Sequence, residues 1–342
     1  MKKIAVAITF FFLWVSNVQA QTQFFAGKTI RIIVGLPAGD VYDVYARILA
    51  EHMGKYIPGN PNIIVQNMPG ASTMTAANYV YNVAKPDGLT FASFLPALYF
   101  DQLIGRKEVQ FDWAKFIWLG SFERSNNLLY MRADTPYKTI HDVTKAVDPP
   151  KCGSTGSGSP SYYMIKLLNE AIGTKFNVVT GYQGGQEIDL AVERGEVHCR
   201  AFTVTTFFAR EPFHTWRKKG FVRVLTQTGK KRDARLSDTP TVYELMDEYK
   251  TPESTRRLAA LVLASGEFGR PIVATPGIPP DRVKILREAF AKTLSDPAVQ
   301  DDVKKKMLEL DPTRGEELEG LAKEVLSAAS EVIERMKSLL GK

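Results

Sequence analysis

Four short loops carry the residues that could do chemistry in this sequence. Each follows an expected strand, precedes an expected helix and is rich in Gly, Ser, Thr or Asn. Such loops can hold an anion, because Gly lets the backbone approach a ligand, hydroxyl groups add donors, and N–H groups converge at a helix N-terminus. One such loop is weak evidence, since ordinary turns need the same residues. The four loops are residues 36–43, 67–73, 153–161 and 181–187.

The serine-rich loop at residues 153–161 could also carry out catalysis. Its composition resembles a phosphate-binding loop, but it lacks the Lys and the spacing of a P-loop. Ser157 lies in the sequence T-G-S-G-S, which is not the G-x-S-x-G turn of serine hydrolases, and no His–carboxylate pair is evident to activate it. The four histidines are scattered, with none at the spacing of a zinc site. The sequence therefore favours binding over catalysis, with no metal and no cofactor.

Alternating strands and helices would position these loops. Strands are expected at residues 29–34, 62–66 and 89–94 with helices between them, and residues 128–228 repeat the plan. This alternation predicts βαβ units and parallel sheets, which bind ligands at the carboxyl ends of their strands. We expect an α/β fold in which two doubly wound sheets flank a cleft. The tail after these units reads as helices without strands of their own, returning to pack on the first lobe.

Composition limits the class of protein further. The 342 residues are enough for two domains, and the formal net charge is +7, spread over several small basic clusters. No base-stacking motif accompanies these clusters, so nucleic acid is not an expected partner. Residues 1–20 have a basic start, an apolar run and small residues before Ala20, which predicts a signal peptide cleaved after Ala20 and an exported protein. The alternative is an uncleaved anchor, for which the apolar run is short.

Several short motifs follow one another along the chain. The first are P-x-G-x-x-x-D-x-x-A-R at residues 37–47 and N-x-P-G-A at residues 67–71. Next come A-K-P-D-G-L-T at residues 84–90 and the Gly/Ser loop. The last are Y-x-G-G at 182–185, R-G-E-V at 194–197 and T-P-G-I-P-P at 275–280. With these motifs in this order, the chain resembles the extracytoplasmic solute receptors of the tripartite tricarboxylate transporter family, also called Bug receptors.

The resemblance implies a two-lobed periplasmic-binding-protein fold of the type II kind. Lobe I would comprise residues 21–127 and 229–342, and lobe II residues 128–228. It implies a monomeric periplasmic receptor that captures a small organic acid in the cleft between the lobes and delivers it to the permease subunits of a tripartite tricarboxylate-type transporter. A receptor feeding a membrane sensor kinase and an enzyme on the same scaffold are the alternatives.

The resemblance also implies which residues hold the ligand, chiefly through backbone N–H groups of the first two loops and hydroxyl groups of the third. Two departures from the family pattern add Asp40 and Phe202 to this set. The expected ligand-binding residues are Pro37, Ala38, Gly39, Asp40, Tyr42, Gly70, Ala71, Ser72, Thr73, Ser154, Thr155, Ser157, Gly158, Ser159, Gln183, Gly184, Gly185 and Phe202.

The departures have two interpretations. Asp40 stands where the family usually has Gly, and the strand that usually reads D-x-M-F-D reads H-C-R-A-F from His198 to Phe202. A bulkier or aromatic ligand could lie against an apolar wall of Phe202, Phe207 and Phe208. Alternatively, Asp40 simply caps the following helix and points to water. Asp43 and Arg47 are spaced as an i,i+4 ion pair that would support the start of that helix.

The two cysteines are a candidate pair. Cys152 and Cys199 each lie at a strand end in the second lobe, and an exported protein enters an oxidising compartment. A disulfide is feasible if the two strands are neighbours, although the geometry between them could forbid it.

Overall fold

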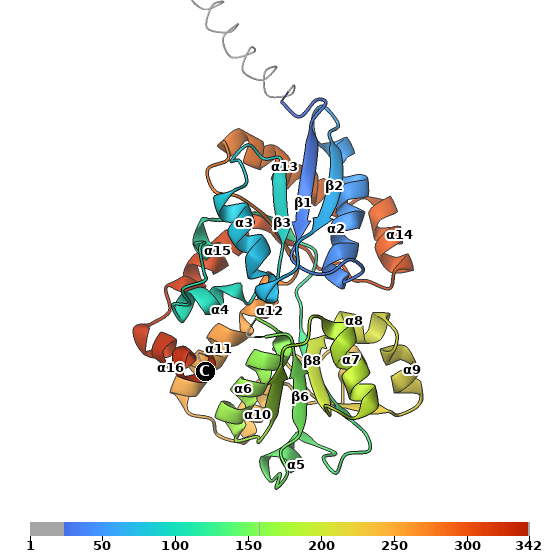
Figure 1. Cartoon of the computed structure of the whole chain (residues 1–342), viewed down its shortest axis with the longest axis vertical. Helices are drawn as coiled ribbons and strands as arrows, with labels where there is room; N and C mark the ends of the chain where they lie inside the picture. The colour runs from blue at the N-terminus through green and yellow to red at the C-terminus, as the bar shows by residue number, and fades with distance from the viewer. Residues whose placement is uncertain (1–23, 157, 341–342) are drawn as a thin grey trace, which may run out of the picture.

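The computed structural model describes residues 24–156 and 158–340. The chain forms two lobes, each built on a mixed β-sheet with helices on its faces (Figure 1). The strand order is β11-β4-β10-β3-β1-β2 in the sheet of lobe I and β7-β6-β8-β5-β9 in the sheet of lobe II. The expected architecture of two α/β sheets is therefore confirmed.

Lobe I takes its strands from three separate parts of the chain. β1 (Thr29–Val34) pairs in parallel with β2 (Asn62–Asn67) and β3 (Thr90–Ser93). β10 (Pro271–Ala274) runs antiparallel between β3 and β4 (Ile117–Ser121), and β11 (Thr313–Arg314) is antiparallel to β4. The helices of this lobe are α2 (Val41–His52), α3 (Met74–Asn82), α4 (Leu98–Leu103), α13 (Pro280–Leu294), α14 (Pro297–Lys305) and α15 (Gly315–Leu326).

Lobe II has a parallel half and an antiparallel half. β6 (Lys151–Ser154) pairs in parallel with β7 (Asn177–Thr180) and β8 (Cys199–Thr203). β5 (Asn127–Arg132) is antiparallel to β8 and β9 (Val222–Gln227). The helices that belong to these strands are α5 (Ile140–Thr144), α6 (Pro160–Ile172), α7 (Gly185–Arg194), α8 (Val204–Ala209) and α9 (Phe213–Lys218).

The tail of the chain differs from the expectation of helices alone. It supplies β10 and β11 to the sheet of lobe I, so the expectation that the tail has no strands of its own is wrong. Both strands are short, and β10 begins with a proline, which removes one backbone donor. The burial of all four β10 residues between β3 and β4 stabilises a strand that shows no alternation in the sequence.

The segment after β9 packs against both lobes before the chain reaches β10. After β9, α10 (Val242–Glu248) and α11 (Glu253–Leu263) pack against α6 of lobe II, and the chain returns to lobe I through α12 (Ser265–Phe268). Figure 1 shows the C-terminal helix α16 (Ser330–Leu340) beside α11, where it also contacts α4 and α6. α10 and α11 therefore pack with lobe II, because their apolar faces complete the core around α6.

The lobes share an apolar core on this side. The Phe100 and Tyr163 rings, from α4 and α6, stack edge to face with centroids 5.3 Å apart, and the Tyr99 hydroxyl donates to the Leu261 carbonyl at 2.5 Å. One continuous cluster of buried side chains extends from Phe94 and Trp113 of lobe I to Leu168 and Leu258 beside lobe II. In the described residues, none of the helices combines the length and apolar character that crossing a bilayer requires.

Candidate binding cleft

The carboxyl ends of the parallel strands face a cleft between the lobes that contains two cavities. The first cavity has a volume of about 120 Å³ and the second about 670 Å³. Leu36 and Leu95 of lobe I and Thr155 of lobe II border both cavities, which therefore adjoin. Each cavity has walls from both lobes, as a ligand site between lobes requires.

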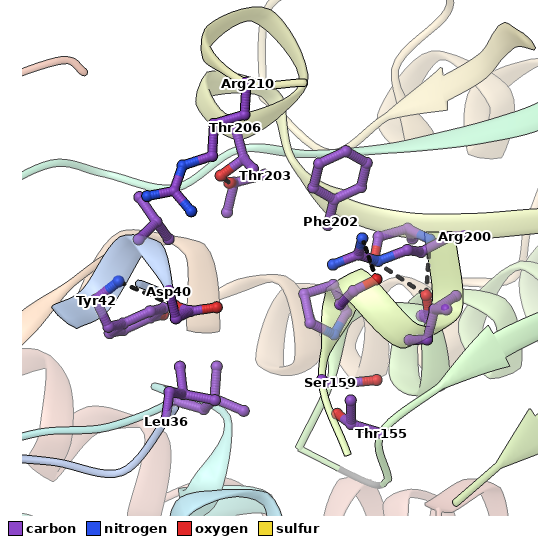
Figure 2. Close-up of a pocket in the computed structure, with 18 of the residues that line it drawn as sticks. Leu36, Asp40, Tyr42, Thr155, Ser159, Arg200, Phe202, Thr203, Thr206 and Arg210 are labelled. Carbon is purple, nitrogen blue, oxygen red and sulfur yellow. Dashed lines mark hydrogen bonds between the residues drawn. The ribbon is translucent and has the colours of Figure 1, made fainter. Parts of the chain in front are cut away.

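The first cavity combines apolar walls with charged groups. Figure 2 shows Leu36, Asp40 and Tyr42 on one side, from lobe I, and Ser159, Arg200 and Phe202 on the other, from lobe II. Its charged lining residues are Asp40, Arg200, Arg210 and Arg270. Cations therefore outnumber carboxylates in the lining of this cavity.

Asp43 organises the first loop from below. Its buried carboxylate accepts the Gly39 N–H at 2.8 Å, the Arg47 Nε at 2.8 Å and the Asn67 Nδ2 at 2.9 Å. Burial raises the pKa of Asp43, but the hydrogen bonds from Arg47, Gly39 and Asn67 outweigh it and lower that pKa overall. Asp43 thus ties the first loop to the end of β2, and the expected pair with Arg47 is present.

Asp40 performs two of the roles considered for it. It is the N-cap of α2, and its Oδ1 accepts the Tyr42 N–H at 3.0 Å. Its half-buried carboxylate also borders the first cavity, so it does not simply point to open water (Figure 2). Asp40 therefore both caps α2 and contributes a charged group to the wall of the first cavity.

The second loop has an unusual backbone. Ala71, Ser72 and Thr73 have φ values of 46°, 50° and 77°, after Gly70 at 145°. Non-glycine residues in this region cost of order 1–3 kcal/mol each and tend to occur at ligand sites. Ala71 and Ser72 line the second cavity, and no carbonyl or side chain of the described residues accepts from their N–H groups. Successive backbone N–H groups of this kind can bind an anion.

The third loop touches the second across the cleft. A Cβ atom on Gly156 would lie 2.6 Å from the Ser72 Oγ, and one on Gly158 would lie 3.3 Å from the Ser72 Cβ. Glycine at these positions therefore lets the two lobes approach. Ser154 is fully buried, with its hydroxyl 2.6 Å from that of Ser159, and it shapes the loop without lining a cavity.

The fourth loop packs around Arg200. Arg200 Nη1 donates to both oxygens of Asp189, at 2.6 and 2.7 Å, and to the Gly185 carbonyl at 3.1 Å. Its guanidinium carbon lies 4.4 Å from the centre of the Phe202 ring. A Cβ on Gly185 would overlap the Arg200 guanidinium, so a larger residue there would require Arg200 to move. Arg200 is thus already engaged by a carboxylate.

The structure distributes the expected ligand-binding residues over both cavities. Asp40, Tyr42, Thr155, Ser159, Gly184, Gly185 and Phe202 line the first cavity. Pro37, Gly70, Ala71, Ser72, Thr73, Thr155 and Gln183 line the second. Ala38, Gly39, Ser154 and Gly158 line neither, and Ser157 lies outside the described residues.

The apolar wall is smaller than sequence reasoning suggested. Phe202 lines the first cavity, whereas Phe207 is buried against Tyr130 and Phe213, and Phe208 packs beneath Arg217. His198 also lies outside both cavities, where its Nδ1 accepts the Lys151 N–H at 3.1 Å.

Sequence reasoning missed two arginines of the first cavity. Arg210 follows α8, and its Nη1 donates to the Gly39 carbonyl of lobe I at 2.9 Å. Arg270 precedes β10 and is 1% exposed. Neither stands in a recognisable motif, and only the folded chain brings them together.

Cys152 and Cys199 form a disulfide in the structure. They are direct partners in the register of the parallel strands β6 and β8, so the condition that the strands be neighbours is met. The bridge fixes the strand that leads into the third loop to the strand that carries Arg200 and Phe202.

Comparison with known proteins identifies the family. The model of the tripartite tricarboxylate transporter family receptor matches residues 45–338. The chain belongs to this family. Proteins of the family are periplasmic solute-binding receptors and not enzymes. A relative encoded in the gbd 5′ region of Cupriavidus necator is 27% identical over 93% of this chain and 90% of its own length.

Solved structures of such receptors share the fold. Periplasmic binding protein BugD is 22% identical with a TM-score of 0.68, covering 91% of this chain and 97% of BugD. MatC from Rhodopseudomonas palustris, with bound malate, is 21% identical with a TM-score of 0.68, covering 92% and 99%. R. palustris Rpa4515, with adipate, is 20% identical with a TM-score of 0.69, covering 92% and 97%.

Proposed function

We propose that this receptor captures a small organic acid in the cleft between its lobes and delivers it to the permease subunits of a tripartite tricarboxylate-type transporter. The observation that carries the proposal is the left-handed run from Ala71 to Thr73, in which Ala71 and Ser72 border the second cavity and have N–H groups with no acceptor among the described residues. Backbone strain of this kind tends to occur at ligand sites, where the surrounding structure holds it in place. A carboxylate is a suitable acceptor for such N–H groups.

Two further observations support an acid as the ligand. The lining of the first cavity has more cationic than anionic side chains. The structural relatives MatC and Rpa4515 bind malate and adipate, which are both organic acids. The proposed ligand-binding residues are those of the four loops that line the two cavities, together with Phe202.

Closure of the lobes is the proposed mechanism. The lobes touch at Ser72 and Gly156, and Arg210 crosses the cleft to the Gly39 carbonyl. A ligand that contacts both lobes binds this closed arrangement more tightly than an open one, and so it shifts the equilibrium toward closure. The closed lobes would then present one continuous surface to the permease.

The remaining parts of the proposal concern location and partners. We infer that residues 1–20 are a signal peptide removed after Ala20, and that the mature protein acts as a monomer in the periplasm. Residues 1–23 lie outside the described residues. A membrane sensor kinase is the competing partner. If the partner is a permease, uptake of the acid should be lost in cells that lack the receptor gene; if it is a sensor kinase, uptake should continue without the receptor.

The proposal is tested by a thermal-shift screen on mature protein that has been unfolded and refolded to remove bound ligand. The panel holds aliphatic mono-, di- and tricarboxylates, aromatic acids, amino acids, and neutral and cationic solutes. A ligand at one hundred times its Kd adds about 2.7 kcal/mol to the free energy of unfolding. We expect stabilisation by one series of acids. Stabilisation by neutral or cationic solutes alone would overturn the proposal.

A further inference from the structure

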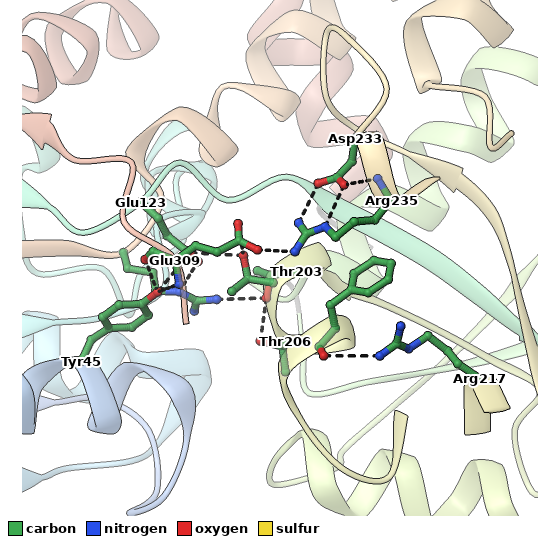
Figure 3. A network of polar contacts seen from close by, with 11 residues as sticks. Tyr45, Glu123, Thr203, Thr206, Arg217, Asp233, Arg235 and Glu309 are labelled. Carbon is green, nitrogen blue, oxygen red and sulfur yellow. Dashed lines mark hydrogen bonds and ion pairs between the residues drawn. The ribbon is translucent and has the colours of Figure 1, made fainter. Parts of the chain in front are cut away.

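A buried ion pair lies at the junction between the lobes. Arg270 Nε donates to Glu123 Oε1 at 2.6 Å, and both side chains are 1% exposed. Glu123 Oε2 also lies within hydrogen-bond distance of the Tyr45 hydroxyl of lobe I, at 3.1 Å (Figure 3), and of the Thr205 hydroxyl of lobe II, at 3.2 Å. Both hydroxyl groups can also donate to Glu309.

The guanidinium of Arg270 is not equally satisfied. Its Nη2 donates to the Thr203 hydroxyl at 3.0 Å, but its buried Nη1 has no acceptor among the described residues. A buried donor on a charged group is costly when it remains unpaired, and a native structure that keeps one calls for an explanation. Arg270 borders the first cavity, with its guanidinium carbon 5.0 Å from the centre of the Tyr42 ring.

Arg210 adds a second cation to the same cavity. It comes from the end of α8, and no carboxylate of residues 24–156 and 158–340 lies within 4.0 Å of it. Burial lowers the pKa of Arg210; attraction to Asp40 opposes this, and repulsion from Arg270 adds to it. An anion in the cavity would stabilise both guanidinium groups. Arg200 differs, because Asp189 already binds it through both oxygens.

We propose that Arg270 and Arg210 form an anion subsite that binds an acid group of the ligand in the first cavity. The inference rests on the proposed function and names two residues of its site. The apolar walls from Leu36 and Phe202 would contact the carbon atoms next to the acid group. An apolar cavity of about 150 Å³ holds a benzene molecule, so the 120 Å³ of this cavity suits a carboxylate with a small apolar neighbour.

The subsite and the amide donors belong to two adjoining cavities. Leu36, Leu95 and Thr155 border both. A dicarboxylate can therefore place one acid group at each set of donors, whereas a monocarboxylate has an acid group for only one of them.

The first test uses sodium acetate as a probe small enough for the subsite. The thermal stability of the wild type is measured as acetate replaces chloride at constant ionic strength, so that general screening is unchanged. We expect a rise with acetate in the wild type that is smaller in Arg210→Gln, because acetate can still bind the amide donors of the second cavity. Arg217→Gln is the matched control, because it removes the same charge from lobe II and Arg217 lines neither cavity. No rise in the wild type, or an equal rise in Arg210→Gln, would overturn the subsite.

Arg270 is tested with its partner, because a single substitution would leave Glu123 buried without a cation. The double variant Arg270→Gln/Glu123→Gln removes both charges and is compared with Glu123→Gln alone. We expect the acetate effect to be smaller in the double variant than in the wild type and to be retained in Glu123→Gln. Retention in both would exclude Arg270 from the subsite.

Titration calorimetry with the acid found in the screen tests the proposed subsite separately from the proposed receptor function. Arg210→Gln is expected to weaken binding tenfold or more relative to Arg217→Gln. Equal affinity in the two variants refutes the subsite and leaves the receptor function intact. Failure of the wild type to bind any acid in the screen refutes the function itself.

Discussion

Removal of the Cys152–Cys199 disulfide should cost a large part of the stability of lobe II. The bridge closes a loop with a sequence separation of 47 residues. The loop-entropy relation gives about 14 cal/mol/K for this length, or about 4 kcal/mol at 25 °C. Both sulfur atoms are buried, so substitution by alanine avoids placing a polar group in the core. The variant Cys152→Ala/Cys199→Ala is therefore expected to unfold about 4 kcal/mol more easily than the oxidised wild type.

The assay is urea unfolding of mature, periplasmically produced protein, followed by far-ultraviolet circular dichroism with and without a thiol-free reductant. The reductant should bring the wild type down to within about 1 kcal/mol of the double variant, and it should leave the variant unchanged because no bridge remains. A variant within about 1 kcal/mol of the oxidised wild type would refute the loop-entropy reasoning. A variant that responds to reductant would show that the effect does not come from the bridge.

Three other substitutions follow from the cleft and its supports. Gly158→Val should weaken binding of the screened acid at least tenfold with little change in the urea midpoint, because a Cβ added at this position would lie 3.3 Å from the Ser72 Cβ. Adding Ser72→Gly should restore the affinity measured by calorimetry. Gly320→Ala, which has open space around it, is the control and should leave the affinity unchanged. Glu123→Gln should lower the free energy of unfolding by about 3–5 kcal/mol, because Arg270 becomes an unpaired buried cation. The double variant Glu123→Met/Arg270→Met should lower it by less, and an equal or larger decrease measured by urea unfolding would contradict this reasoning. Asp43 has a folded pKa below its unfolded value of about 3.9, so it stabilises the fold above that pH and loses this effect as the pH falls through the folded pKa. The stability difference between Asp43→Asn and wild type should therefore be constant above about pH 5 and shrink below about pH 4; growth of that difference on acidification would contradict the sign.

Local patterns in the sequence were sufficient for much of the fold and for two of the details. The strands β1, β2 and β3 and their loops follow from apolar runs that end in Gly, Pro or Asn. Asp40 as a helix cap and Asp43 paired with Arg47 are local interactions, which depend only on residues within one turn. The two cysteines were a candidate pair, but only the order of strands in the folded sheet shows that β6 and β8, which carry them, are neighbours.

The features that sequence reasoning missed depend on distant contacts. Arg270 is 147 positions from Glu123, and nothing near either residue indicates that both are buried. Arg210 reaches the Gly39 carbonyl over 171 positions. The packing of α10 and α11 against α6 likewise depends on distant contacts. The sequence of an amphipathic helix shows which of its faces is apolar, but it does not show which core that face contacts.

The distribution of contacts between the lobes indicates where they should part. On the side of α6, α11 and α16 the lobes share buried apolar side chains such as Phe100 and Tyr163, and their separation would expose a large apolar area to water. Across the cleft the contacts are polar: Thr205 with Glu123, Arg210 with the Gly39 carbonyl, and Arg235 with Glu309. Water can replace these groups at little net cost. Opening should therefore break the polar contacts and pivot about the shared core. The Gly39 carbonyl, which accepts from Arg210, and Glu123, which pairs with Arg270, both take part in these polar contacts. An acid bound to Arg210 and Arg270 in the first cavity would therefore stabilise the contacts that opening must break.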